Sequence, residues 1–170
     1  MAEPQPAPRR NLRGRVVRVV ILSPRPDRVA LIAGSLTSKG HIALTATSLT
    51  DAADRRLWDG AHVVLLDWAP YEYDTPEHAL RWVAAALPRV PVVVITNPFE
   101  PRQGLKAIAN KASGLLYNDN LSTKTLDIVV SDAYRRSLAP LPKPSQPRVT
   151  RECMAIVGKM ASRYSSKGDS

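Results

Sequence analysis

The chain has little sulfur and no long apolar run, and both shortages narrow the class of protein. Cys153 is the single cysteine, so no disulfide can form within the chain, which agrees with a reducing compartment. No apolar run approaches the roughly 20 residues that a membrane helix needs. The proline-rich, arginine-containing start also lacks the apolar segment of a secretory signal. We therefore expect a cytoplasmic protein without a membrane partner.

The patterns that usually mark catalysis or metal binding are also missing. His41, His62 and His78 are scattered, without a cysteine or carboxylate cluster at ligand spacing. The turn at residues 23–26 reads SPRP and lacks the glycines of a dinucleotide-binding loop. No serine or cysteine stands in a nucleophile pattern. The sequence thus predicts a protein that is not an enzyme and has no cofactor.

Positive charge is present in excess, and it gathers at the two ends of the chain. The net charge is +9: residues 1–18 hold five arginines and Glu3, a net +4, and residues 135–170 hold a net +6. Residues 19–134 hold eleven basic and twelve acidic groups, a net −1. Basic ends attract nucleic acid or other anionic partners. The alternative is that they only keep a globular core in solution.

Short β-branched runs alternate with segments of helical period from residue 16 onward. Five strand–helix pairs with short links predict an α/β fold, a right-handed, doubly wound, parallel five-stranded sheet. The predicted strands are 16–22, 41–45, 61–67, 90–96 and 114–117. The first predicted helix carries Val29, Ile32, Ala33 and Leu36 on one face and ends at Lys39. The next three are 48–58, 76–87 and 101–111, and the last follows Ser122.

Polar and glycine residues stand where helices should begin and end. Ser48 lies three residues before Asp51, as in a capping box, and Thr75 precedes Pro76 at a first helical position. Gly40 occupies the place where a left-handed residue usually closes a helix. These residues support the predicted helix boundaries.

Composition divides the chain into four parts. Residues 1–14 are predicted to be a disordered, basic arm rich in proline and arginine, and residues 15–138 to be the folded domain. Residues 139–148 contain four prolines and are predicted to be a linker. Residues 149–170 are predicted to form a short amphipathic helix and a polar tail. Such a helix needs a surface in this chain or another, because a lone helix of that length is marginal in water.

Asp67 is the residue that points most directly to a site. It ends the buried run at 61–66, and open α/β folds place their ligands at the carboxyl ends of parallel strands. Thr96 and Asn118 stand at the ends of the fourth and fifth predicted strands. Two plainer interpretations stay open. Asp67 can cap the loop or helix that follows, and Thr96 can be an ordinary β-branched strand end.

The spacing of these strand ends resembles the receiver domain of bacterial response regulators, over about residues 15–138. The resemblance implies a flavodoxin-like fold in which Asp67 takes the place of the phosphate-accepting aspartate. Thr96 matches the hydroxyl that ends the fourth strand, and Leu115 or Tyr117 matches the switch aromatic. Asn118 stands where the family has a lysine. The implied setting is a two-component system or phosphorelay.

Two departures separate the chain from that pattern. The acidic pair that holds Mg²⁺ in the family is matched by Ser23 and Pro24, neither of which supplies a carboxylate. Mg²⁺ prefers several hard oxygen ligands, so Asp67 alone is expected to bind it weakly. Asn118 removes the fixed positive charge of the lysine. We therefore expect a pseudo-receiver. A side chain or an arginine that fills the pocket would favour this interpretation, whereas an ordered Mg²⁺ would favour phosphorylation.

The segment 149–157 is similar to the first helix of the helix-turn-helix in NarL/LuxR-type regulators, and 164–167 resembles the approach to its second helix. The sequence ends before a recognition helix, so readout of the major groove by that motif is not expected. From the whole pattern we predict a regulator of bacterial signalling or transcription that works through protein contacts. One such contact is a homodimer through its fourth helix, fifth strand and fifth helix. The alternatives are nucleic-acid binding by the basic ends and a phosphorylation switch at Asp67.

Overall fold

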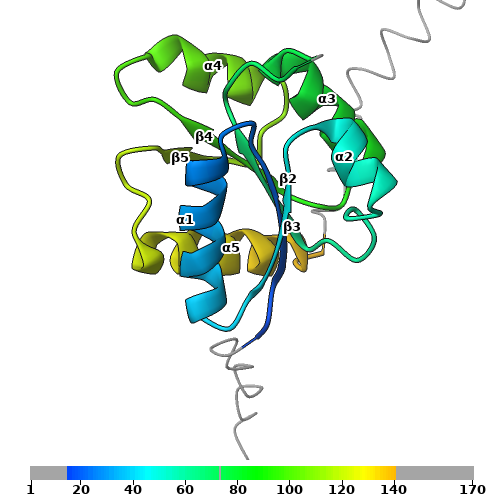
Figure 1. The fold of residues 1–170 in the computed structure, drawn as a ribbon, viewed down its shortest axis with the longest axis vertical. Helices are drawn as coiled ribbons and strands as arrows, with labels where there is room; N and C mark the ends of the chain where they lie inside the picture. The colour runs from blue at the N-terminus through cyan, green and yellow to red at the C-terminus, as the bar shows by residue number, and fades with distance from the viewer. Residues whose placement is uncertain (1–14, 73, 141–170) are drawn as a thin grey trace, which may run out of the picture. The chain divides into compact units, whose positions relative to one another are not determined.

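The structure, a computed structural model, describes residues 15–72 and 74–140. Five parallel strands form one sheet in the order β2-β1-β3-β4-β5, and a helix follows each strand in the chain (Figure 1). The predicted (βα)5 fold is confirmed. The strands are β1 (Arg18–Leu22), β2 (Ile42–Ala46), β3 (Val63–Asp67), β4 (Val92–Thr96) and β5 (Gly114–Tyr117), and the helices are α1 (Pro26–Ser38), α2 (Leu49–Asp54), α3 (Pro76–Ala86), α4 (Pro101–Ala109) and α5 (Thr123–Ser137).

Three predicted parts of the chain lie outside the described residues: the arm at 1–14, nearly all of the linker at 139–148, and the helix and tail at 149–170. Within the described ranges, none of the helices is long and apolar enough to cross a membrane.

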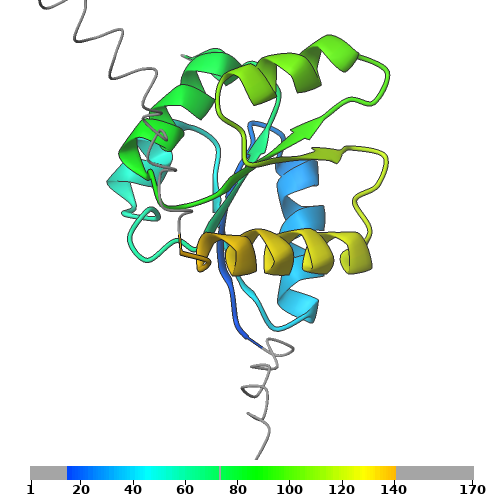
Figure 2. The ribbon, with the colours of Figure 1, turned by 180° about the vertical axis from the view of Figure 1, so that it is seen from behind.

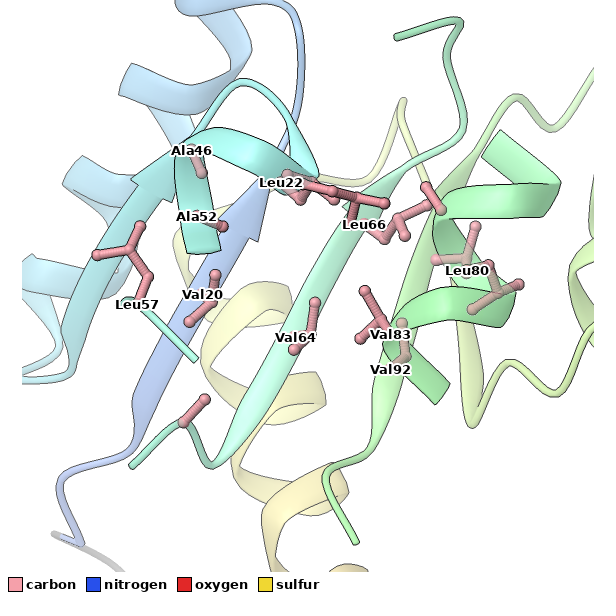
Figure 3. Close-up of a cluster of buried hydrophobic side chains, with 14 of the residues drawn as sticks. Val20, Leu22, Ala46, Ala52, Leu57, Val64, Leu66, Leu80, Val83 and Val92 are labelled. Carbon is pink, nitrogen blue, oxygen red and sulfur yellow. The ribbon is translucent and has the colours of Figure 1, made fainter. Parts of the chain in front are cut away.

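The sheet lies between its helices, as the opposite views of Figures 1 and 2 show. One layer of buried apolar side chains lies on each face of the sheet. Successive side chains of a strand point to opposite faces, so Val64 and Leu66 of β3 pack with α2, α3 and α4, whereas Val63 and Leu65 pack with α1 and α5. Figure 3 shows the first of these layers. All residues of β3 and β4 are buried, which is why these strands are apolar up to their last residues, Asp67 and Thr96.

The predicted caps are confirmed where a side chain carries them. Ser48, Thr75 and Ser122 each accept a hydrogen bond from the backbone N–H three residues later. A complete capping box at α2 would have the Asp51 side chain accept from the N–H of Ser48. The box is only partly formed, because Asp51 accepts instead from the N–H of Thr47 at 3.1 Å. Gly40 has a φ of +83° and closes α1, since His41 N–H bonds to Leu36 O and Gly40 N–H bonds to Thr37 O.

Two helices are shorter than predicted because residues other than glycine take the left-handed conformation. Arg56 has a φ of +52°, and the N–H of Leu57 bonds back to the carbonyl of Ala52, which ends α2 at Asp54 and not at residue 58. Lys111 has a φ of +71° and closes α4 in the same way, after Ala109. The sequence hides both ends, because glycine is the usual signal for this closure.

These closures allow a matched test of backbone conformation. Gly34 and Gly40 both have open space around the position of an added Cβ, but only Gly40 has a positive φ. We expect Gly40→Ala to lower the free energy of unfolding by about 1 kcal/mol and Gly34→Ala, inside α1, to raise it by about 0.5 to 1 kcal/mol. Lys111→Gly should be neutral or stabilising. Urea denaturation of the three variants measures these changes. Equal effects of the two alanine substitutions would contradict the assigned conformations.

Candidate functional site

The carboxyl ends of the strands bring Asp67 to the centre of one edge of the sheet. β3 pairs with β1 on one side and with β4 on the other, so Asp67 lies between the ends of those two strands. The side chain is 1% exposed. A buried carboxylate must be compensated by hydrogen bonds or an opposite charge. Its partners therefore define the site.

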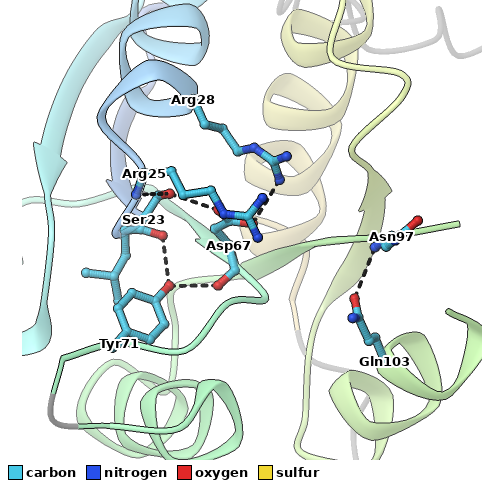
Figure 4. A network of polar contacts seen from close by, with 8 residues as sticks. Ser23, Arg25, Arg28, Asp67, Tyr71, Asn97 and Gln103 are labelled. Carbon is cyan, nitrogen blue, oxygen red and sulfur yellow. Dashed lines mark hydrogen bonds and ion pairs between the residues drawn. The ribbon is translucent and has the colours of Figure 1, made fainter. Parts of the chain in front are cut away.

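Three side chains from the β1 end and the start of α1 surround this carboxylate (Figure 4). Ser23 Oγ donates to Asp67 Oδ2 at 2.9 Å, and Arg28 Nη1 donates to Asp67 Oδ1 at 3.0 Å. Arg25 Nε lies 3.7 Å from Oδ2. Both oxygens are thus occupied, and Arg28 is the stronger ionic partner. Its side chain is 17% exposed, whereas that of Arg25 is 46% exposed and screened by water.

Tyr71 closes the site from the loop after β3. Its hydroxyl lies 3.0 Å from the carbonyl oxygen of Leu22 and 2.8 Å from that of Asp67, so one O–H group bridges the ends of β1 and β3 (Figure 4). Burial raises the pKa of the Tyr71 phenol, and the charge of Asp67 raises it further, against an opposite effect of Arg25. The phenol therefore stays protonated and acts as a donor at neutral pH.

Thr96 and Asn118 lie at the same edge but do not reach the carboxylate. The N–H of Asn118 donates to the Thr96 carbonyl at 2.9 Å, which ties the ends of β5 and β4 together. The Thr96 hydroxyl is buried and has no hydrogen-bond partner among the described residues. No hydrogen bond in the described ranges joins either side chain to Asp67. The structure thus brings Ser23 to Asp67 and leaves Thr96 and Asn118 as a separate pair. Pro24, half-buried, only links Ser23 to Arg25.

Leu115 and Tyr117 share one face of β5, as the alternation of a strand requires. Leu115 is half-buried and packs on the layer beneath α4, and a Cβ added to Gly104 would lie 3.2 Å from its Cδ1. Tyr117 pairs with Thr96 in the register and is exposed. Their proposed role as a switch stays a prediction.

The donor set does not fit a magnesium ion. Residues 15–72 and 74–140 contain no cluster of three histidine, cysteine or acidic residues suited to a metal. Asp67 is the carboxylate of the site, and the guanidinium of Arg28 stands 3.0 Å from one of its oxygens. A divalent cation at that oxygen would meet a positive charge and too few hard ligands.

The arrangement corrects one interpretation of the sequence. The idea that Asp67 caps the following loop is wrong, because the hydrogen-bond partners of its carboxylate are Ser23 and Arg28, before and within α1. Tyr71, in the loop after β3, is buried.

Sequence reasoning missed Arg25, Arg28 and Tyr71 as members of the site. An arginine in the pocket was considered only as an observation that would favour a pseudo-receiver, and no residue was named for it. The sequence places Arg28 in the first turn of α1, near the carboxyl edge of the sheet, but it has no signal for whether that long side chain points to the site or to water.

Comparison with solved structures identifies the fold. The chain is similar to the receiver domain of NtrX from Brucella abortus, with 21% identity, a TM-score of 0.63, and 69% of this chain and 98% of that domain covered. Against the longer NtrX chain the TM-score is 0.67 at 21% identity, with 72% of this chain but only 28% of NtrX covered. A two-component response regulator from Clostridium difficile matches at 17% identity and a TM-score of 0.63, covering 72% of this chain and 99% of that one. No protein-family model and no curated protein sequence matches. The chain therefore has the fold of response-regulator receiver domains.

Proposed function

We propose that this chain is a pseudo-receiver, a non-enzymatic module of bacterial two-component signalling or transcriptional control that acts through protein contacts without aspartyl phosphorylation. The observation that carries the proposal is the contact between Arg28 and Asp67 at 3.0 Å. A guanidinium and a serine hydroxyl occupy the two oxygens of the carboxylate at the phosphate-accepting position. The proposal is supported by the position of that carboxylate at the carboxyl ends of the parallel strands, where open α/β folds bind their ligands.

The chemistry of phosphoryl transfer explains why this contact matters. A carboxylate that accepts a phosphoryl group needs a free lone pair directed at phosphorus, and cations must neutralise the charge that develops on the transferring oxygens. Here the carboxylate is almost fully buried and already neutralised from within. The acidic pair and the lysine expected in a receiver are replaced by Ser23, Pro24 and Asn118.

One feature favours the competing function of a phosphorylation switch. The buried Thr96 hydroxyl has no partner within the described part of the chain, and a phosphoryl oxygen would supply one. For that to happen, Arg28 must leave Asp67, which costs the ion pair and uncovers a buried charge. We therefore rank this function second.

A protein-binding surface is offered by α4, which turns its large side chains outward. Ala107 is the fully buried residue of this helix, whereas Leu105 is 69% exposed and Ile108 is 60% exposed. Phe99, just before the helix, is also exposed, and hydrogen bonds from Phe99 N–H and Glu100 N–H to Asn97 brace its loop. An exposed apolar surface of this kind is typical of a contact site. We propose that it forms part of a homodimer interface with β5 and α5.

Phosphorylation is tested by mass. The full chain incubated with acetyl phosphate and Mg²⁺ should show no stoichiometric gain of a phosphoryl group. A receiver domain with an intact acidic pair, which should gain the phosphoryl group in the same buffer, is the control. A stoichiometric gain that disappears in Asp67→Ala would overturn the proposal and establish the phosphorylation switch.

The ion pair is tested by comparing two arginines that face the same carboxylate. Arg28→Met should lower the free energy of unfolding by about 3 kcal/mol, because it leaves Asp67 buried with less compensation. Arg25→Met should cost about 0.5 kcal/mol or less, since this pair is longer and exposed. Adding Asp67→Asn to Arg28→Met should recover part of the loss. Denaturant unfolding of the three variants and the unmodified protein gives these changes, and equal losses from the two arginine variants would show that Arg28 is not the dominant partner.

The α4 surface is tested by sedimentation equilibrium. Leu105→Ser combined with Ile108→Ser should weaken self-association at least about tenfold, since apolar contacts at the centre of an interface typically contribute more than about 1 kcal/mol each. Leu31→Ser, at a similarly exposed leucine on α1, is the control and should leave the association unchanged. If the chain stays monomeric at all concentrations, or if both variants behave alike, the homodimer surface is wrong.

A further inference from the structure

The amino edge of the sheet, opposite Asp67, gathers two arginines and two rings. Arg18 begins β1, His62 directly precedes β3, and Tyr134 lies in the last turns of α5. The His62 and Tyr134 rings stack with centroids 4.5 Å apart and an interplanar angle of 17°. The guanidinium of Arg15 lies 5.8 Å from the centre of the Tyr134 ring. Residues distant in sequence thus converge on one small area.

Backbone hydrogen bonds fix how His62 presents itself. The N–H of Arg18 donates to His62 Nδ1 at 3.0 Å, and the N–H of His62 donates to the Arg18 carbonyl at 2.8 Å. Because Nδ1 accepts a hydrogen bond, the proton of the neutral ring sits on Nε2. His62 therefore presents an N–H donor beside the arginines.

The positive charge of this area lacks a counter-ion in the described part of the chain. No carboxylate of residues 15–72 or 74–140 lies within 4.0 Å of Arg15 or Arg18. Arg18 Nε is buried and has no hydrogen-bond partner among the same residues. Burial lowers the pKa of His62, and the charges of Arg18 and Arg15 lower it further.

We propose that Arg15, Arg18 and the Nε2–H of His62 form a phosphate-binding site at the amino edge, and that its ligand is the phosphodiester backbone of a nucleic acid. Guanidinium groups bind phosphate oxygens in a bidentate manner, and an unpaired cluster of them is most stable with an oxyanion between its members.

A polymer is favoured over a single phosphate by the sequence that leads into the site. Arg9, Arg10 and Arg13 precede Arg15 and Arg18, so five arginines follow one another within ten residues. Such a run suits a ligand with regularly repeated phosphates. The site is separate from the Asp67 edge, and its existence does not depend on whether Asp67 is phosphorylated.

Binding is measured by fluorescence anisotropy of a labelled single-stranded oligonucleotide with the full chain. Arg15→Gln combined with Arg18→Gln should weaken binding at least about tenfold and lower the slope of log affinity against log salt by about two. Arg102→Gln combined with Lys124→Gln removes the same charge from exposed positions at the opposite edge and should change affinity by no more than about twofold. Equal weakening by both pairs would replace the site with diffuse attraction, and the absence of binding would overturn it.

A second measurement uses the unmodified protein and is independent of variant folding. The oligonucleotide neutralises Arg15 and Arg18, so the NMR titration midpoint of His62 should rise on binding, and affinity should rise as the pH falls through that midpoint. An unchanged midpoint would exclude the site. If inorganic phosphate or pyrophosphate shifts the midpoint and competes as well as the oligonucleotide does, the ligand is a small anion and the nucleic-acid assignment is wrong.

Discussion

The ion pair between Arg28 and Asp67 joins the first helix to the centre of the sheet, and the arrangement of the carboxyl edge depends on it. Asp67 is buried at the end of β3, where an uncompensated charge would cost several kcal/mol. Arg28 and Ser23 offset that cost through contacts of 3.0 and 2.9 Å. The start of α1 has no side-chain cap of its own. The pair therefore stabilises both a buried carboxylate and the position of a helix.

The two edges of the sheet differ in whether their charged side chains have partners within the described part of the chain. At the carboxyl edge a carboxylate meets its cations inside the protein, and Tyr71 seals the site with a protonated hydroxyl. At the amino edge Arg15 and Arg18 stand beside His62 without a carboxylate among the described residues. An edge whose charges are satisfied internally is suited to holding a conformation. An edge whose charges are unsatisfied is suited to binding a ligand, which is why the proposed phosphate site lies at the amino edge.

The fold could be predicted from the sequence because each element carries a physical signal of its own. Apolar runs fixed the five strands within about two residues. Side-chain caps marked helix starts, and Gly40 marked the end of α1. The ends of α2 and α4 could not be predicted, because Arg56 and Lys111 adopt a conformation that their side chains disfavour and that only the surrounding packing selects. Asp67 was found from its place at a strand end. Arg28 was not, because a long side chain in a first helical turn can point to water or to the site, and the sequence contains no signal for that choice.

The charges of the residues around Asp67 are consistent with one another, whatever partner the module has. A receiver that uses Mg²⁺ gathers several carboxylates around a divalent ion and adds a lysine. Here Ser23 and Pro24 contribute no charge, so Asp67 is left with one negative charge, which Arg28 matches at 3.0 Å and Arg25 supports more weakly at 3.7 Å. The neutral Asn118 adds no further cation to this edge. Restoring only one acidic residue would set an unpaired carboxylate beside a site that has no ion to share. The absence of the acidic pair and the presence of Arg28 are therefore two aspects of one electrostatic arrangement.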